Sequence, residues 1–320
     1  MRLRVAVVYT VEPDAKNTVN PHGDEQLNRT NAALQEAIIS LGHEVHMIPG
    51  DFDLLNTLAE IKPDVIFNNC TGIHDKSSQP QIAGMLELSG IPFTGSGQTA
   101  HTLSLYKPLT KKILLFHGVS TPRFIVVDVD RRADLSELTF PVIVKPEHEG
   151  SSIGITQKSV AHNEAELKDA VEHVLTHFHQ PALVEEFITG REFTVGVWGG
   201  PEPKIIPPVE IMFEQGGGFY STAVKAQDLV RTKVPTEIEP ELYDRIERQV
   251  LGAYHALELR DYCRIDVRVA SDGTPHVIDV NTLPGLEPLY SDYPKACLVM
   301  GVEFHEMVGH LLNCAYSRRK

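Results

Sequence analysis

The stretch of sequence that decides the fold runs from residue 140 to 154 and reads Phe-Pro-Val-Ile-Val-Lys-Pro-Glu-His-Glu-Gly-Ser-Ser-Ile-Gly. A short β-branched run ends in Lys145, a loop with glycines and serines follows, and an apolar run at 153–157 is expected as the returning strand. Small residues let backbone amides converge on an anion, and the lysine adds a charge suited to a phosphate. A glycine-rich hairpin with a surface lysine is the alternative. No Gly-x-x-x-x-Gly-Lys-[Ser/Thr] loop occurs in the chain, which sets it apart from P-loop proteins.

A second segment places polar side chains on two strands joined by a turn. It begins Cys-Arg-Ile-Asp-Val at 263–267 and ends His-Val-Ile-Asp-Val-Asn-Thr-Leu-Pro-Gly at 276–285. Because side chains alternate along a strand, a hairpin would bring Asp266, Asp279 and Asn281 together. Three oxygen-bearing side chains suit Mg²⁺, which completes its shell with water and substrate phosphates. The alternative is an ion pair between Arg264 and a neighbouring acid, which would leave Asp279 buried and unpaired at a cost in free energy.

Upstream of these segments, the first hundred residues alternate between strand and helix patterns. The predicted strands are 3–8, 45–48 and 65–67, and the predicted helices are 30–41 and 82–88. This alternation predicts an α/β unit with a parallel sheet. Further along, the predicted helices are 107–116, 163–177 and 239–259, and the predicted strands include 123–127, 142–145, 182–188, 262–269 and 276–280. We therefore expect three compact units, at residues 1–98, 99–187 and 188–320.

Composition and charge narrow the class of partner. The chain has 29 Lys and Arg against 43 Asp and Glu, a formal net charge of −14, which argues against nucleic acid or an anionic membrane as the main partner. The longest apolar runs, such as 113–116, are far too short to span a membrane, and the first residues lack the features of a signal peptide. The four cysteines have no metal-like spacing. We expect free thiols in the cytoplasm and small-molecule partners.

Four ordered motifs carry a resemblance to a known family. They are Gly-Met-Leu-Glu-Leu-Ser-Gly-Ile-Pro-Phe-Thr-Gly-Ser-Gly at 84–97, the segment from Lys145 to Gly154, Glu-Glu-Phe-Ile-Thr-Gly-Arg-Glu-Phe-Thr-Val at 185–195, and Asn-Thr-Leu-Pro-Gly at 281–285. In these motifs the chain resembles the ATP-grasp superfamily and, within it, the D-alanine–D-alanine ligase family. The resemblance implies that a two-domain ATP-grasp fold, α+β in character, follows the N-terminal parallel-sheet domain. It also implies a reaction in which ATP activates a carboxylate as an acyl phosphate that an amine then attacks, forming a dipeptide, ADP and phosphate.

The resemblance assigns roles to matching positions. The residues implied to hold ATP are Lys107, Lys145, Ser151, Ser152, Glu185, Glu186, Phe187, Ile188 and Glu192. Two Mg²⁺ ions, or Mn²⁺ in their place, would be held by Asp266, Asp279 and Asn281. The residues implied to act at the reacting groups are Arg264, Ser151, the Gly285 amide and Lys225. Those implied to contact the substrates are Ser291 and, in place of the family's usual glutamate, Asp24 or Glu25.

Departures from the family pattern lie near the expected amino-acid pocket. They are the loop after the first strand, residues 69–78, Ala226 where the family has a tyrosine, and a longer loop after Asn281 that contains Glu287. Two functions within the same chemistry therefore stay open: a D-alanine–D-alanine ligase of cell-wall synthesis, or a ligase of other amino or hydroxy acids in specialised metabolism. A third reading, a nucleotide-binding protein without catalysis, predicts loss of the metal or phosphate ligands, which are all present. A homodimer is left open.

Overall fold

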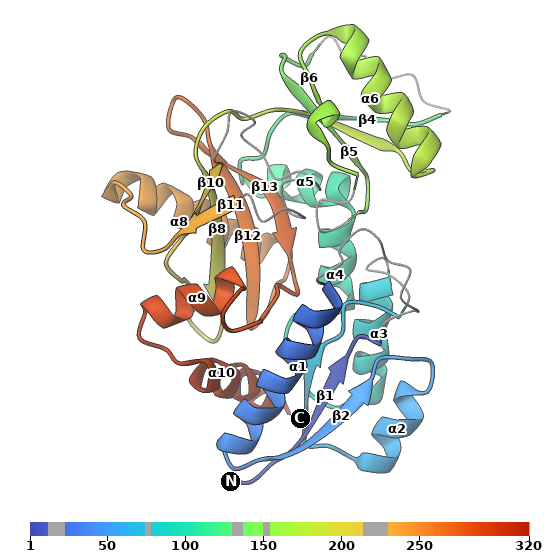
Figure 1. The fold of residues 1–320 in the computed structure, drawn as a ribbon, viewed down its shortest axis with the longest axis vertical. Helices are drawn as coiled ribbons and strands as arrows, with labels where there is room; N and C mark the ends of the chain where they lie inside the picture. Colours follow the sequence, from blue (N-terminus) through green and yellow to red (C-terminus); the bar gives the residue numbers. More distant parts are fainter. Residues whose placement is uncertain (12–22, 74–77, 130–136, 150–153, 214–229, 320) are drawn as a thin grey trace.

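Three sheets follow one another along the long axis of the molecule (Figure 1). The computed structural model describes residues 1–319 apart from 12–22, 74–77, 130–136, 150–153 and 214–229. The first sheet is parallel, as predicted, and the other two are antiparallel. The fold class expected from the sequence is confirmed by this combination of a parallel N-terminal sheet with antiparallel sheets after it.

The N-terminal sheet has the strand order β2-β1-β3. Its strands are β1 (Arg4–Tyr9), β2 (Glu44–Pro49) and β3 (Val65–Asn69), and its helices are α1 (Gly23–Ser40), α2 (Leu54–Ile61) and α3 (Gln79–Ser89). Strands β1 and β3 are buried along most of their length, which explains their near-continuous apolar sequences. Two further helices, α4 (Gln98–Leu105) and α5 (Lys107–Phe116), lead from this unit to the next sheet. The predicted helix at 107–116 matches α5.

The central sheet has the order β4-β7-β5-β6 and is antiparallel throughout. Its strands are β4 (Phe124–Val127), β5 (Val142–Pro146), β6 (Val160–Ala161) and β7 (Ala182–Glu186). Helix α6 (Glu164–His177) packs against it, and the Asn163 side chain caps this helix by accepting from the Glu166 amide at 3.0 Å.

The prediction of a strand at 153–157 was wrong. The partner of β5 is β6, where Val142 pairs with Ala161, and the described residues before it form a turn and a short 3-10 helix at Gln157–Ser159. The Thr156 hydroxyl caps that helix by accepting from the Lys158 amide at 3.2 Å. Threonine and serine side chains that bond to nearby backbone compete with strand pairing, and this moves the return strand further along the chain.

The C-terminal sheet has the order β11-β10-β8-β12-β13, with β9 also paired to β8. The strands are β8 (Glu192–Trp198), β9 (Lys204–Ile205), β10 (Val209–Phe213), β11 (Val230–Lys233), β12 (Tyr262–Val269) and β13 (Pro275–Asn281). Helix α8 (Pro240–Ala256) shares an apolar core with β8 and β12, and α9 (Asp292–Val299) and α10 (Phe304–Tyr316) end the chain. The predicted strand at 262–269 matches β12.

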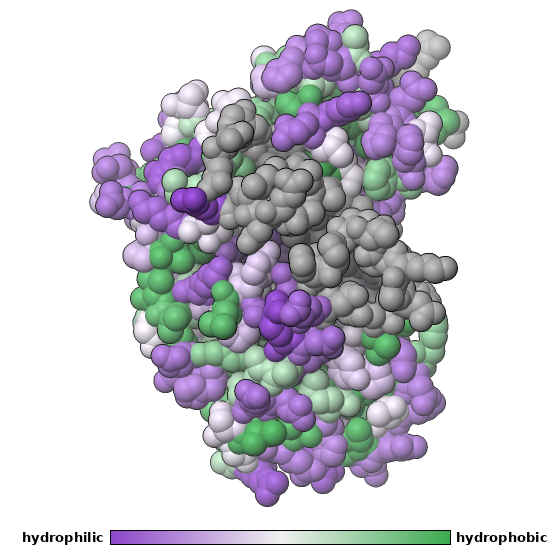
Figure 2. Space-filling model, viewed as in Figure 1, coloured by the Kyte–Doolittle hydropathy of each residue, from purple (hydrophilic) through white to green (hydrophobic). Residues whose placement is uncertain are grey.

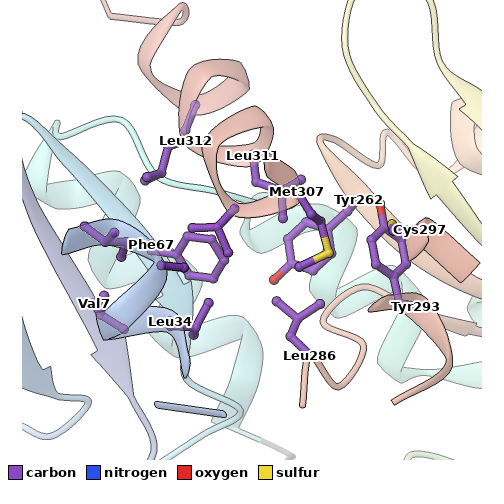
Figure 3. Close-up of a cluster of buried hydrophobic side chains, with 14 of the residues drawn as sticks. Val7, Leu34, Phe67, Tyr262, Leu286, Tyr293, Cys297, Met307, Leu311 and Leu312 are labelled. Atoms are coloured by element: carbon purple, nitrogen blue, oxygen red, sulfur yellow. The ribbon is translucent and has the colours of Figure 1, made fainter. Parts of the chain in front are cut away.

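Helix α10 returns to the N-terminal sheet and joins the two ends of the chain in one core. Figure 3 shows Leu34 and Phe67 of the N-terminal unit beside Leu311 and Met307 of α10, with Tyr262 close by. Aromatic and branched side chains buried together in this way supply most of the stabilising free energy of such a contact. The predicted unit boundaries stay a prediction, but the first and last units share this core.

The surface and the cysteines carry two simpler findings. No helix in the described part of the chain is long and apolar enough to cross a membrane. The face drawn in Figure 2 mixes polar and apolar side chains rather than presenting one continuous apolar band. All four cysteines are free thiols, as expected.

Candidate active site

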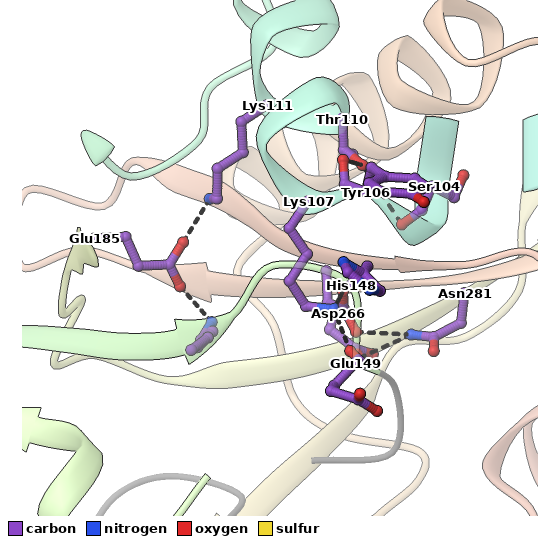
Figure 4. Close-up of polar contacts among 12 residues, drawn as sticks. Ser104, Tyr106, Lys107, Thr110, Lys111, His148, Glu149, Glu185, Asp266 and Asn281 are labelled. Atoms are coloured by element: carbon purple, nitrogen blue, oxygen red, sulfur yellow. Dashed lines mark hydrogen bonds and ion pairs between the residues drawn. The ribbon is translucent and has the colours of Figure 1, made fainter. Parts of the chain in front are cut away.

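Two lysines and one glutamate form a buried cluster between α5 and the central sheet. In the β5–β7 ladder Lys145 lies opposite Leu183 and Ile143 opposite Glu185, so Lys145 and Glu185 are diagonal neighbours on one face. Lys145 pairs with one oxygen of Glu185, and Lys111 Nζ lies 2.7 Å from the other (Figure 4). Burial opposes the charge on Glu185, but the two lysines outweigh it and lower the pKa of this carboxyl to about 2.

Lys111 is a site residue that the sequence reasoning missed. Its side chain is 4% exposed and also donates to Thr121 Oγ1 at 2.7 Å. Burial lowers the pKa of Lys111, and Glu185 opposes that shift. The available signal was its spacing: Lys111 lies one helical turn after Lys107, on the same face of α5.

Lys107 connects the loop after β5 to the C-terminal hairpin. Its Nζ donates to the Glu149 carbonyl at 2.5 Å and lies 3.8 Å from Asp279 Oδ1. The side chain is 12% exposed, so it is largely enclosed. A cation here stands between the end of the glycine- and serine-bearing loop and the acids of β13, which is where a phosphate with its counter-ions would fit.

The hairpin of β12 and β13 brings the predicted acidic residues together. Asp266 pairs with Asp279 across the ladder, and Arg264 pairs with Asn281. The Asn281 amide donates to Asp266 Oδ2 at 3.2 Å and lies 3.5 Å from Asp279 Oδ2. The prediction that these three side chains converge is therefore confirmed.

The same hairpin corrects one argument made from the sequence. Arg264 does form a two-pronged pair with Asp266, with Nε and Nη2 at 3.1 and 3.0 Å from its oxygens. Burial disfavours the guanidinium charge, but Asp266 raises the pKa of Arg264 above its ordinary value. Asp279 is neither buried nor unpaired, since its side chain is 32% exposed and faces Lys107. The ion-pair reading and the cation reading are thus compatible.

The donor set of this hairpin fits a hard divalent cation. It offers two carboxylates and a side-chain amide oxygen within one cluster, which is the oxygen chemistry that Mg²⁺ prefers. Asn281 turns its amide nitrogen toward the carboxylates here, so binding would require the amide to present its oxygen instead. Asp266, Asp279 and Asn281 would hold the ion, and Arg264 and Lys107 balance the acids without it.

The segment after β7 is held by Arg268, a second residue that the sequence reasoning missed. Arg268 donates to the Ile188 carbonyl at 2.7 Å, stacks over Phe187 at 4.7 Å, and pairs with Glu192 at 2.9 Å. Burial raises the pKa of Glu192 to about 7, against the opposing effect of Arg268. The Glu186 side chain instead accepts from the Thr139 amide at 3.1 Å. Of the residues expected to hold ATP, Phe187, Ile188 and Glu192 thus lie together beside one arginine.

The residues expected at the amino acids lie around the loop after β13. The Glu287 amide donates to Ser291 Oγ at 3.1 Å, and a Cβ added to Gly285 would lie 2.9 Å from that oxygen. Glu25 lies on α1 and pairs with Arg29 at 2.8 Å, and Arg29 in turn lies 3.3 Å from Glu287. The remaining predicted positions, Ser151, Ser152, Lys225 and the side chain of Asp24, lie outside the described residues, as does Ala226.

Comparison with known proteins agrees with this arrangement. A family model described as the D-Ala–D-Ala ligase C-terminus matches residues 118–313. A D-alanine–D-alanine ligase of Desulforudis audaxviator is 32% identical over 297 residues, which cover 91% of this chain and 94% of that protein. The chain belongs to the D-alanine–D-alanine ligase family.

Solved structures of D-alanine–D-alanine ligases and related enzymes share the fold. That of a D-alanine–D-alanine ligase from Bacillus anthracis, complexed with ATP, superposes with a TM-score of 0.78 at 24% identity, covering 99% of this chain and 98% of that one. That of VanG D-Ala:D-Ser ligase from Enterococcus faecalis has a TM-score of 0.78 at 23% identity, covering 98% of this chain and 100% of the other. The family resemblance expected from the motifs is confirmed.

The D-alanine–D-alanine ligase family model spans most of the described site. Its matched range includes Lys145, Glu185 and the whole β12–β13 hairpin, whereas Lys107 and Lys111 precede it. The roles of the individual residues are not tested by that match and stay predictions.

Proposed function

We propose that this protein is an ATP-dependent ligase that joins two amino acids through an acyl-phosphate intermediate, with D-alanine in both positions. The observation that carries the proposal is the meeting of Lys107 with Asp279 at 3.8 Å, beneath the Lys145–Glu185 pair. The Lys107–Asp279 contact connects α5 to the β12–β13 hairpin, whose Asp266 and Asp279 lie opposite each other, while Lys145 lies on a strand of a different sheet. ATP use agrees with the family.

The proposed reaction has to give a carboxylate the good leaving group that it lacks. A carboxylate resists attack by an amine because its leaving group would be oxide, and transfer of the γ-phosphoryl group replaces that leaving group with phosphate. Such a transfer requires positioning and charge stabilisation more than covalent participation of the protein. Lys107 and Lys145 would hold the phosphates, and bound Mg²⁺ (or Mn²⁺) would supply Lewis acidity at the phosphoryl oxygens.

Arg264 and the Gly285 amide would act in the second half of the reaction. When the amine attacks the acyl phosphate, negative charge develops on the carbonyl oxygen and phosphate then leaves. Arg264 keeps a full positive charge because Asp266 holds it in place at 3.0 Å. Donors fixed in advance around such an oxygen each contribute about 10²- to 10³-fold in rate.

A second candidate function keeps this chemistry and changes the substrates to other amino or hydroxy acids. Within this candidate, Glu287 favours a different amino acid, because a buried acid in the loop after β13 alters the expected amino-acid pocket. The fold leaves the substrate open, since the Enterococcus faecalis protein of the same fold is a D-Ala:D-Ser ligase.

The test is ATP-dependent phosphate release across a panel of D- and L-amino acids and hydroxy acids, alone and in pairs, with product masses. The proposal expects D-alanine alone to support turnover and to yield its dipeptide. Turnover only with another acid would favour the second candidate, and no release with any of them would favour a protein without catalysis. The proposal also includes a cytoplasmic location, in keeping with four free thiols, and a homodimer, which light scattering tests.

A further inference from the structure

Glu287 is a buried acid with only half of its hydrogen-bonding capacity used. The residue is 5% exposed, and its Oε1 lies 3.3 Å from Arg29 Nε. Its Oε2 is fully buried and has no hydrogen-bond partner among the described residues. Buried carboxylate oxygens in folded proteins are almost always hydrogen-bonded, so this oxygen indicates a missing donor.

Arg29 does not supply the missing charge. Its Nη1 pairs with Glu25 Oε1 at 2.8 Å, so one guanidinium serves two carboxylates. The cluster of Glu25, Arg29 and Glu287 therefore has two negative charges and one positive charge. The missing donor is therefore expected to be a cation.

The backbone that carries Glu287 is anchored on both sides of its Cα. The Glu287 amide donates to Ser291 Oγ at 3.1 Å, and the Ser291 amide donates back to the Glu287 carbonyl at 2.9 Å. The preceding residue, Leu286, is 1% exposed and packs into the core that joins the two ends of the chain. With its backbone anchored and its side chain buried against Arg29, Glu287 loses little conformational freedom when a ligand arrives, which favours binding.

Glu287 also lies near the expected reaction centre. Gly285, whose amide faces the reacting carbonyl in the proposed function, lies against the Ser291 hydroxyl that anchors Glu287, since a Cβ added to Gly285 would come within 2.9 Å of that oxygen. A cation bound at Glu287 would therefore belong to a molecule undergoing reaction. Amino-acid substrates carry such a cation, an ammonium group with three donors.

We infer that Glu287 binds the ammonium group of an amino-acid substrate, with Arg29 holding the other carboxylate oxygen. This inference rests on the proposed function and deepens it, because it names the substrate group that the loop recognises. A hydroxy acid offers a neutral hydroxyl at the same place and leaves the cluster one positive charge short. The site therefore selects amino acids over the corresponding hydroxy acids.

The experiment compares D-alanine with D-lactate, which differ in this group alone. For the unmodified enzyme and for Glu287→Gln, we would measure the KM for D-alanine, the inhibition constant of D-lactate against D-alanine, and the KM for ATP. Glu287→Gln keeps the shape and removes the charge. It is expected to raise the KM for D-alanine by about 10- to 100-fold, the range for loss of a charge-assisted hydrogen bond. The inhibition constant of D-lactate is expected to change by less than about twofold.

Two further variants separate recognition from structure. Glu202→Gln removes a carboxylate from an exposed loop and is expected to leave all three constants unchanged. Glu287→Asp keeps the charge and is expected to keep the preference for D-alanine even if Glu287→Gln does not fold. Thermal melting of each variant reports any loss of the contact with Arg29.

The outcomes distinguish this inference from the proposed function. If Glu287→Gln bound D-alanine and D-lactate more weakly by the same factor, or had an unchanged KM for D-alanine, the inference would be overturned. The proposed ligase function would still stand. The inference would also be overturned if Glu287→Asp bound D-alanine no better than D-lactate. If the unmodified protein releases no phosphate in response to any amino acid, the proposed function fails and this inference fails with it.

Discussion

The cluster proposed to bind ATP (Lys111, Lys145 and Glu185, the ATP side) and the cluster proposed to bind the amino acid (Glu25, Arg29 and Glu287, the amino-acid side) differ in how their charges are balanced. On the ATP side, Glu185 pairs with both Lys111 and Lys145, all three nearly or fully buried. On the amino-acid side, Arg29 is shared between Glu25 and Glu287, and one Glu287 oxygen lacks a partner among the described residues. The first cluster has one positive charge in excess, which suits a phosphate, whereas the second has one negative charge in excess, which suits a cation.

The difference follows from the elements that carry each side. Lys145 and Glu185 lie on adjacent strands of one sheet, where the ladder register places them on the same face. Arg29 and Glu287 lie on α1 and on a loop 258 residues apart in sequence, and no ladder connects them. The comparison indicates that chemistry common to ATP ligases is built into the sheets, while substrate choice is left to loops.

Removing the charge of Asp266 should have the largest effect. Asp266→Asn is expected to lower ATP-dependent phosphate release by about a thousandfold, since it weakens a cation site with few protein ligands and releases Arg264. The fold should survive, because Asn281 and Thr194 still contact the side chain. Asp244→Asn, on the exposed face of α8, is the control. Near-normal turnover at saturating Mg²⁺ would contradict the metal assignment.

Removing one cation from either side should lower the stability of the protein. Lys111→Met is expected to lower the free energy of unfolding by about 3 kcal/mol, because it leaves the buried Glu185 with one lysine. Arg29→Met is expected to cost about 3 kcal/mol or more, because the buried Glu287 then has no cation among the described residues, although Arg29 itself is 45% exposed.

Denaturant unfolding of both variants, with the exposed Lys112→Met as control, measures these losses. A loss for Arg29→Met well below that for Lys111→Met would show that Glu287 does not depend on Arg29 in the way the contacts indicate.

Removing Lys145 should affect ATP selectively. Lys145→Ala is expected to raise the KM for ATP by about 10- to 100-fold and to lower kcat, because the lysine is predicted to contact phosphate in both the bound and the transition state. The KM for the amino acid should change little. Steady-state kinetics at varied ATP checks this, and unchanged ATP kinetics would mean that Lys145 serves only the pair with Glu185.

The smallest predicted effect concerns pH and Glu192, an acid expected to contact ATP whose burial outweighs its ion pair with Arg268. Its pKa is raised to about 7, so its contribution to stability is complete below its unfolded value of 4.5 and is lost as pH rises through 7. The unmodified protein should therefore lose about 1–2 kcal/mol relative to Glu192→Gln between pH 5 and pH 8.

Unfolding of both proteins in denaturant at the two pH values measures that difference. A gain in stability of the unmodified protein relative to Glu192→Gln over this range would instead show that Arg268 keeps Glu192 ionised throughout.

Local patterns in the sequence were enough for the parallel sheet, for helix α5, and for the convergence of Asp266, Asp279 and Asn281. Each depends on a period of two or 3.6 residues within a short segment, and such periods are set by backbone geometry alone. The same reasoning was wrong about the strand at 153–157, where Thr156 and Ser159 bond to nearby backbone. It was also wrong in leaving Asp279 unpaired, because its partner Lys107 lies on α5, far from the β12–β13 hairpin in sequence.

What only the tertiary structure decided is which charges meet. Lys111 looks like any lysine on an amphipathic helix until β7 brings Glu185 against it, and Arg268 looks like any strand residue until it reaches the Ile188 carbonyl. Glu287 could be singled out in the sequence as a departure, but its burial and its half-used carboxylate depend on α1 and α10 closing over the loop. Sequence periodicity determines which face a side chain takes, whereas burial and pairing depend on the partner that the fold brings to that face.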